Sequence, residues 1–122
     1  MPDTKRSYRQ KGEQTLRIST WRIKELTGYE PITTFYEDFS IADRFGLSAV
    51  KDTYRRGLKT AESLGYQYLT EFVMALNWKI WEHYERNEPL ARLYNDLWEK
   101  ADIYAQEHLK DEELSYYYRT TD

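Results

Sequence analysis

The most chemically suggestive feature of this sequence is a row of positive side chains. Lys51, Arg55 and Lys59 recur every four residues, with Arg56 beside them, in a segment whose apolar pattern predicts a helix. This spacing would place the cations on one helix face, where they could neutralise a few phosphate groups of a nucleic acid. A solvated helix face would show the same pattern, so both interpretations stay open.

The segment that precedes these cations resembles the first helix and turn of a helix-turn-helix. Ala42 would pack beneath the second helix, Gly46 would form the turn four residues later, and Ser48 would open the recognition helix. Asp52, however, stands where that motif needs an apolar anchor. The sequence therefore allows either a small DNA-binding regulator with a helix-turn-helix-like element at residues 40–60 or an ordinary αα-hairpin.

Residues suited to catalysis or metal binding are sparse. The chain has no cysteine, which excludes disulfides, thiolate metal sites and cysteine nucleophiles. Its glycines form no phosphate-binding fingerprint, and no serine lies in a nucleophile elbow. His83 and His108 could share a metal between adjacent helices, but a lone helical histidine is more often a half-buried or surface residue. We expect no enzyme activity, no cofactor and no metal.

Aromatic residues favour a role in binding. The chain holds 12 tyrosines against four phenylalanines, and tyrosine suits wet contact surfaces because it combines an apolar ring with a hydroxyl tip. Trp78 and the consecutive Tyr116, Tyr117 and Tyr118 are the predicted contacts with a partner protein.

Length and charge limit the class of protein. A chain of 122 residues is enough for one domain, and no apolar run approaches the roughly 20 residues of a membrane helix. The predicted location is therefore the cytoplasm. Up to Lys59 there are 12 basic and 8 acidic residues, whereas 6 basic and 13 acidic residues follow it. The acidic half could also mimic nucleic acid, which is a third alternative.

The elements that carry these residues are predicted to be helices. Residues 1–30 form a basic N-terminal arm that is partly helical, with a short helix at 19–26 favoured over a strand at 16–18. Residues 31–122 form a single helical domain, an all-α compact bundle of about four main helices.

Caps and apolar stripes set the expected boundaries of these helices. Thr33 or Thr34 caps the first, Ser48 caps the second, the third covers about 67–86, and Asn87 caps the fourth. One or two further helical turns follow residue 110. The predicted core consists of Phe39, Val50, Tyr54, Leu58, Leu69, Phe72, Val73, Leu76, Ile80, Leu90, Leu93, Leu97 and Ala101.

Three stretches, residues 39–46, 76–81 and 114–122, together resemble a family of small helical proteins encoded in prophages and conjugative elements. The resemblance covers residues 31–122. That family has no assigned activity, so it implies no catalytic or binding residue. It implies a non-enzymatic interaction protein of a phage or mobile element that binds a partner protein, such as host defence machinery, with DNA binding as the alternative.

Overall fold

The computed structural model of this chain describes the backbone of residues 31–121 and the side chains of residues 34–121. The predicted arm at residues 1–30 lies outside the described residues. Residues 31–121 form helices and no strand, which confirms the all-α prediction. The helices are α2 (Pro31–Asp43), α3 (Leu47–Leu64), α4 (Tyr66–His83), α5 (Glu88–His108) and α6 (Glu112–Thr121).

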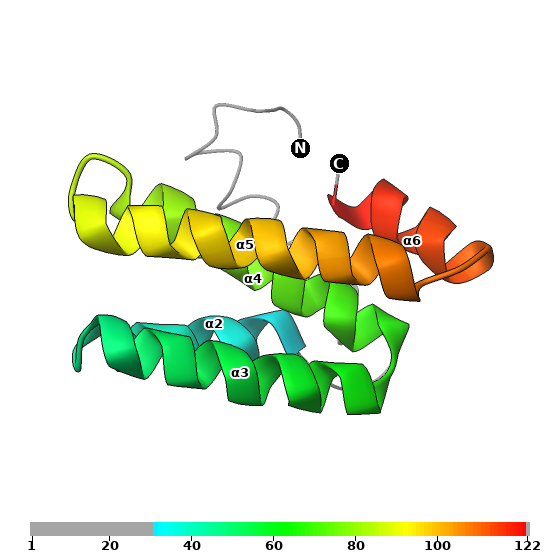
Figure 1. The fold of residues 1–122 in the computed structure, drawn as a ribbon, viewed down its shortest axis with the longest axis horizontal. Coiled ribbons are helices and arrows are strands. Elements are labelled where there is room, and N and C mark those ends of the chain that lie inside the picture. The colour runs from blue at the N-terminus through cyan, green and yellow to red at the C-terminus, as the bar shows by residue number, and fades with distance from the viewer. Residues whose placement is uncertain (1–30, 122) are drawn as a thin grey trace.

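Helix α4 lies at the centre of the bundle and packs against the other four described helices. Every residue from Leu69 to Leu76 is buried, as expected for a helix that is covered on all sides. Helices α2 and α3 form one antiparallel pair, α4 and α5 form a second, and α6 packs across one end (Figure 1). No helix in the described part of the chain has the length and apolar character needed to cross a membrane.

The predicted core is confirmed. Ten of its residues are buried, and Leu58, Ile80 and Leu93 are partly buried against them. Phe72 of α4 is the hub of this core, because the rings of Phe35, Phe39 and Tyr54 lie 5.2, 5.7 and 5.7 Å from its own ring centre. Gly57 allows α3 to approach this hub, since a Cβ atom there would lie 2.6 Å from the Phe72 ring.

Three of the predicted helix boundaries are wrong by a few residues. Helix α4 ends at His83 rather than at about residue 86. Helix α2 begins at Pro31 rather than after Thr33 or Thr34, and α3 begins at Leu47 rather than after a Ser48 cap. Gly46 occupies the N-cap position of α3 with a φ of 106°, a left-handed conformation that glycine tolerates at little cost.

Two further predictions concern the start of α5 and the C-terminal tail, and only the first is confirmed. The Asn87 cap of α5 is confirmed, because its side-chain oxygen accepts a hydrogen bond of 3.2 Å from the backbone N–H of Leu90. The tail forms a helix of 10 residues, α6, which is longer than one or two turns.

Candidate interaction site

Helices α2 and α3 pack against α4 on one face of their pair, and a groove runs between them on the opposite face. This outer groove has a volume of about 540 Å³ and is lined only by residues of α2, α3 and the turn between them. Its apolar lining comes from Phe35, Ile41, Ala42, Phe45 and Ala49, and its polar rim from Asp38, Asp52 and Arg56. A polar rim around an apolar floor is typical of a protein-binding groove.

Large apolar side chains remain exposed at one end of the outer groove. Phe45 is 75% exposed, Ile41 is 54% exposed, and the adjacent Leu47 is 44% exposed. A phenylalanine that retains three quarters of its surface contributes little to the core. Grouped exposed apolar residues mark binding surfaces more often than single ones do.

The charges on the rim of the outer groove partly balance one another. Burial and the neighbouring Glu37 raise the pKa of Asp38, while the positive charge of Arg56 lowers it. Asp52 is paired with Arg55 one turn along α3. A partner would therefore meet a negative charge on the α2 side of the apolar floor and both signs of charge on the α3 side.

A buried polar network holds the end of α2 that carries this surface. Asp43 is the last residue of α2, and its Oδ2 atom lies 2.7 Å from both Lys79 Nζ and His83 Nε2. Its Oδ1 accepts a hydrogen bond of 2.5 Å from the Tyr94 hydroxyl. Burial alone would raise the pKa of the Asp43 carboxyl, but the hydrogen bonds from His83, Lys79 and Tyr94 outweigh it and hold that pKa below its usual value.

Lys79 is the centre of this network, and its side chain is completely buried. Besides Asp43, its ammonium group donates to Glu82 Oε1 and Ser40 Oγ, each at 3.0 Å. An ammonium group has three N–H donors, so three acceptors satisfy it fully. The lysine is thus sequestered from any substrate, and its contacts tie α4 to α2.

The same network gathers the only described group of side chains with metal-ligand spacing. Donor atoms of Asp43, Glu82 and His83 all lie within 4.8 Å of one another in the described part of the chain. The Lys79 ammonium already supplies the positive charge between the two carboxylates. A metal ion bound there would lie beside this ammonium and be repelled by it, so the arrangement suits a structural ion-pair network.

The alternative of a metal ion shared by His83 and His108 is excluded by the positions of the two rings. His83 stacks on Tyr94, with ring centres 5.8 Å apart, whereas His108 is exposed and stacks on Tyr104 at 3.8 Å. Tyr94 and His108 are separated by about 21 Å along α5, from a rise of about 1.5 Å per residue. The two histidines therefore cannot share an ion.

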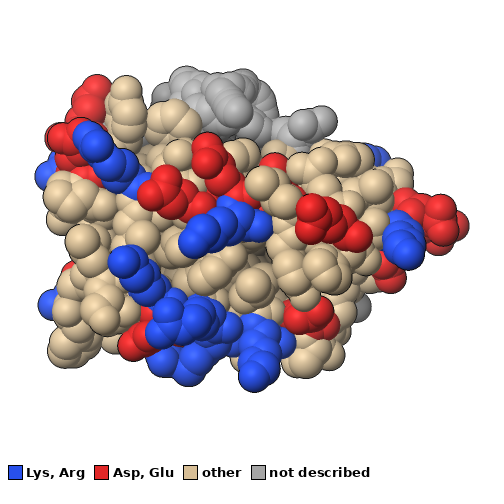
Figure 2. All heavy atoms as spheres, viewed as in Figure 1, with Lys and Arg blue, Asp and Glu red and all other residues tan. Residues whose placement is uncertain are grey.

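The predicted row of cations is exposed but divided between two surfaces. Lys51 and Arg55 line a second groove between α3 and α5, whereas Arg56 lines the outer groove. Lys59 is exposed on the same helix. Lys and Arg side chains gather over α3, while acidic side chains are more frequent over α5 (Figure 2).

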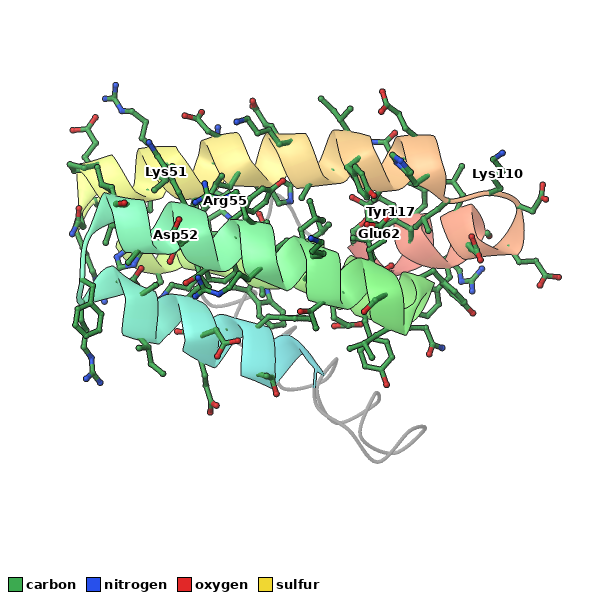
Figure 3. The ribbon with its side chains drawn as sticks, turned by 60° about the horizontal axis from the view of Figure 1, so that its bottom comes forward. Lys51, Asp52, Arg55, Glu62, Lys110 and Tyr117 are labelled. Atoms are coloured by element: carbon green, nitrogen blue, oxygen red, sulfur yellow. The ribbon has the colours of Figure 1, made fainter. Side chains whose placement is uncertain are left out.

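The helix-turn-helix geometry is not present. Helices α2 and α3 lie side by side and run in opposite directions in both views (Figures 1 and 3). The two helices of a helix-turn-helix instead cross at roughly 90–120°. The two helices are antiparallel because both pack lengthwise on α4, so the turn at Gly46 connects the helices of an αα-hairpin.

The predicted aromatic contacts are only partly available to a partner. Trp78 is 6% exposed and Tyr117 is 1% exposed, so their assignment as contact residues is wrong. Tyr117 donates a hydrogen bond to Asp102 and holds α6 against α5. Tyr116 is half-buried against Tyr66, and only Tyr118 is well exposed, at 45%.

Sequence reasoning missed Ile41 and Phe45 as surface residues. It treated the apolar residues around Gly46 as packing within a helix-turn-helix. The signal that could have identified them is spacing, because Ile41 and Phe45 are four residues apart and lie off the stripe of Phe35, Phe39 and Ala42. Comparisons with protein-family models, with curated proteins and with solved structures find no match to this chain.

Proposed function

We propose that this chain is a non-enzymatic interaction protein that binds an amphipathic helix of a partner protein in the outer groove of α2 and α3. The observation that carries the proposal is the exposure of Phe45 and Ile41, at 75% and 54%, beside an apolar groove. Host defence machinery as the partner rests on the sequence resemblance alone and stays a prediction.

The shape of the outer groove suits a helix. Two antiparallel helices bound it, and the small residues Ala42, Ala49 and Gly57 line it. A third helix could lie along it with apolar residues at positions i, i+3 or i+4, and i+7, as in other helix-in-groove complexes. Complete burial of an exposed Ile or Phe side chain stabilises a complex by about 1.5 to 3 kcal/mol.

A matched pair of variants tests this function. Ile41→Asp places a charge in the outer groove, and Ile103→Asp places one at an equally exposed isoleucine of α5, since the two side chains are 54% and 55% exposed. Both variants and the wild type would be tagged, captured from the native host after cross-linking, and compared by mass spectrometry. Thermal melting by circular dichroism checks that both variants fold.

We expect the wild type and Ile103→Asp to capture the same partner protein and Ile41→Asp to lose it. A further variant, Phe45→Asp, should also fail to capture this partner. An identical set of captured proteins for all four chains would contradict the use of this groove.

Binding of duplex DNA by α3 is the second candidate, favoured by the exposure of Lys51, Arg55, Arg56 and Lys59. If α3 binds DNA, replacing Lys51, Arg55 and Lys59 with Ala should flatten the slope of log K against log salt by about 0.9 for each phosphate that the variant no longer neutralises. We expect weak binding with little change in slope, because the acidic side chains over α5 repel a duplex that extends beyond one helix. A gel shift at two salt concentrations distinguishes these outcomes.

A further inference from the structure

The second groove, between α3 and α5, has a chemistry different from that of the outer groove. It has a volume of about 410 Å³, and its walls include Lys51, Tyr54 and Arg55 on one side and Leu93, Leu97 and Lys100 on the other. Lys51 and Arg55 lie on the side of α3 that faces α5 (Figure 3). Two helices thus contribute three exposed cations to one small groove.

Acidic side chains near this groove offset the cations only in part. Asp96 lines the groove on α5, and Asp52 pairs with Arg55 on α3. The side chains of that pair are 68% and 48% exposed, and exposed ion pairs contribute little free energy. Arg55 can therefore exchange Asp52 for an anionic ligand at small cost.

Tyr54 adds a hydrogen-bond donor to the groove. The residue is only 9% exposed, and its ring packs against Phe72 with ring centres 5.7 Å apart. Its hydroxyl forms no hydrogen bond with any described residue, whereas the buried hydroxyls of Tyr94 and Tyr117 each donate to a carboxylate. The Tyr54 hydroxyl oxygen is not one of the fully buried polar atoms that lack a partner in the described residues, so it is accessible to solvent and open to a ligand in the groove. Burial raises the pKa of Tyr54, which keeps the hydroxyl protonated and able to donate.

We propose that the groove between α3 and α5 binds a phosphate monoester. A phosphate monoester carries nearly two negative charges and three strong acceptor oxygens at neutral pH. Arg55 can donate two parallel hydrogen bonds to it, Tyr54 donates a third, and Lys51 and Lys100 supply charge. Leu93 and Leu97 offer an apolar wall to the organic group of the ester.

Several features favour one phosphate group over a nucleic-acid backbone. The groove is small, and Asp96 would repel a second phosphate beside the first. Lys59 and Arg56, which a backbone would also need, do not line this groove. The residues involved differ from Ile41 and Phe45, so this site and the proposed protein interface can fail independently.

Titrations of the labelled full chain with phenyl phosphate and with inorganic phosphate, followed by nuclear magnetic resonance, test the proposal. The variants are Tyr54→Phe, which keeps the ring and removes the hydroxyl, and Lys100→Gln. Lys59→Gln is the matched control, because Lys59 is an exposed lysine that does not line the groove. Thermal melting confirms that each variant is folded before it is titrated.

We expect saturable binding of phenyl phosphate, with resonances of Lys51, Tyr54 and Lys100 among those that shift. Tyr54→Phe should weaken it about tenfold, as expected when one hydrogen bond to a charged group is removed. Lys100→Gln should weaken it by a smaller factor, because it removes one exposed charge from the groove. Phenyl phosphate should bind more tightly than inorganic phosphate, because its ring can contact Leu93 and Leu97. Equal affinity for the two ligands would contradict binding of a monoester. Three results would overturn the proposal. They are an equal loss of affinity in Lys59→Gln, an unchanged affinity in Tyr54→Phe, and binding of duplex DNA with the same dependence on Tyr54.

Discussion

Replacing Lys79 with methionine should strongly destabilise this bundle, even though methionine fills a similar volume. The substitution removes the donor to Asp43, Glu82 and Ser40. It leaves the mostly buried carboxylate of Asp43 and the partly exposed carboxylate of Glu82 without this cation. Removing one partner of a buried ion pair typically costs about 3 to 5 kcal/mol, because the remaining charge is uncompensated. Domains of this size have only about 5 to 15 kcal/mol of stability, so the loss is a large fraction of the total.

Urea denaturation followed by far-ultraviolet circular dichroism measures this loss. Lys59→Met is the control, because Lys59 is an exposed lysine on α3 and should change stability by less than about 0.5 kcal/mol. The combined variant Asp43→Asn with Lys79→Met should lose clearly less than the sum of the two single variants, since the charges are removed together. A loss below about 1 kcal/mol for Lys79→Met would refute a role for the network in holding α2 to α4.

Three further predictions concern the core and its tyrosines. Leu76→Ala should lower the free energy of unfolding by about 2 to 5 kcal/mol in urea denaturation, because Leu76 is fully buried in α4; a loss below about 1 kcal/mol would contradict its place there. Gly57→Ala should destabilise the fold by about 1 to 3 kcal/mol despite the better helix propensity of alanine, because the new methyl group would overlap the buried Phe72 ring; a rise in melting temperature would contradict this. Burial, together with hydrogen bonds to Asp43 and Asp102, raises the pKa values of Tyr94 and Tyr117 above the unfolded value of about 10, so stability should be constant below that pH and fall as pH rises above it. The difference in high-pH absorbance between the wild type and Tyr94→Phe or Tyr117→Phe should show each tyrosine ionising together with unfolding. Ionisation of either residue in the folded protein near pH 10 would oppose that assignment.

The sequence predicted a helix boundary well where neighbouring residues specify that boundary. The Asn87 cap and the nearby Pro89 specify the start of α5 without reference to the rest of the chain. The apolar stripe of Leu69, Phe72, Val73 and Leu76 likewise predicted a buried face of α4, whereas its central place in the bundle was not predicted. Patterns of this kind depend on residues within one or two turns of each other.

Features that depend on distant residues were not predictable in this way. Lys79, Glu82 and His83 have the polar character of a helix end that faces solvent, and their partner Asp43 lies about 40 residues earlier, so burial of the lysine depends on how α2 packs. The glycine turn at Gly46 specifies a reversal of the chain but not the angle between α2 and α3. That angle is decided by the surfaces that both helices present to α4, which no short motif contains.

The network around Lys79 also restricts how this protein can evolve. Asp43, Lys79 and Tyr94 satisfy one another inside the bundle, so changing one of them leaves a charge or a hydroxyl without its match. In related chains these positions are expected to be retained together or exchanged together for apolar residues. The exposed lysines of α3 carry no such mutual constraint and are free to vary one at a time, unless a ligand holds them.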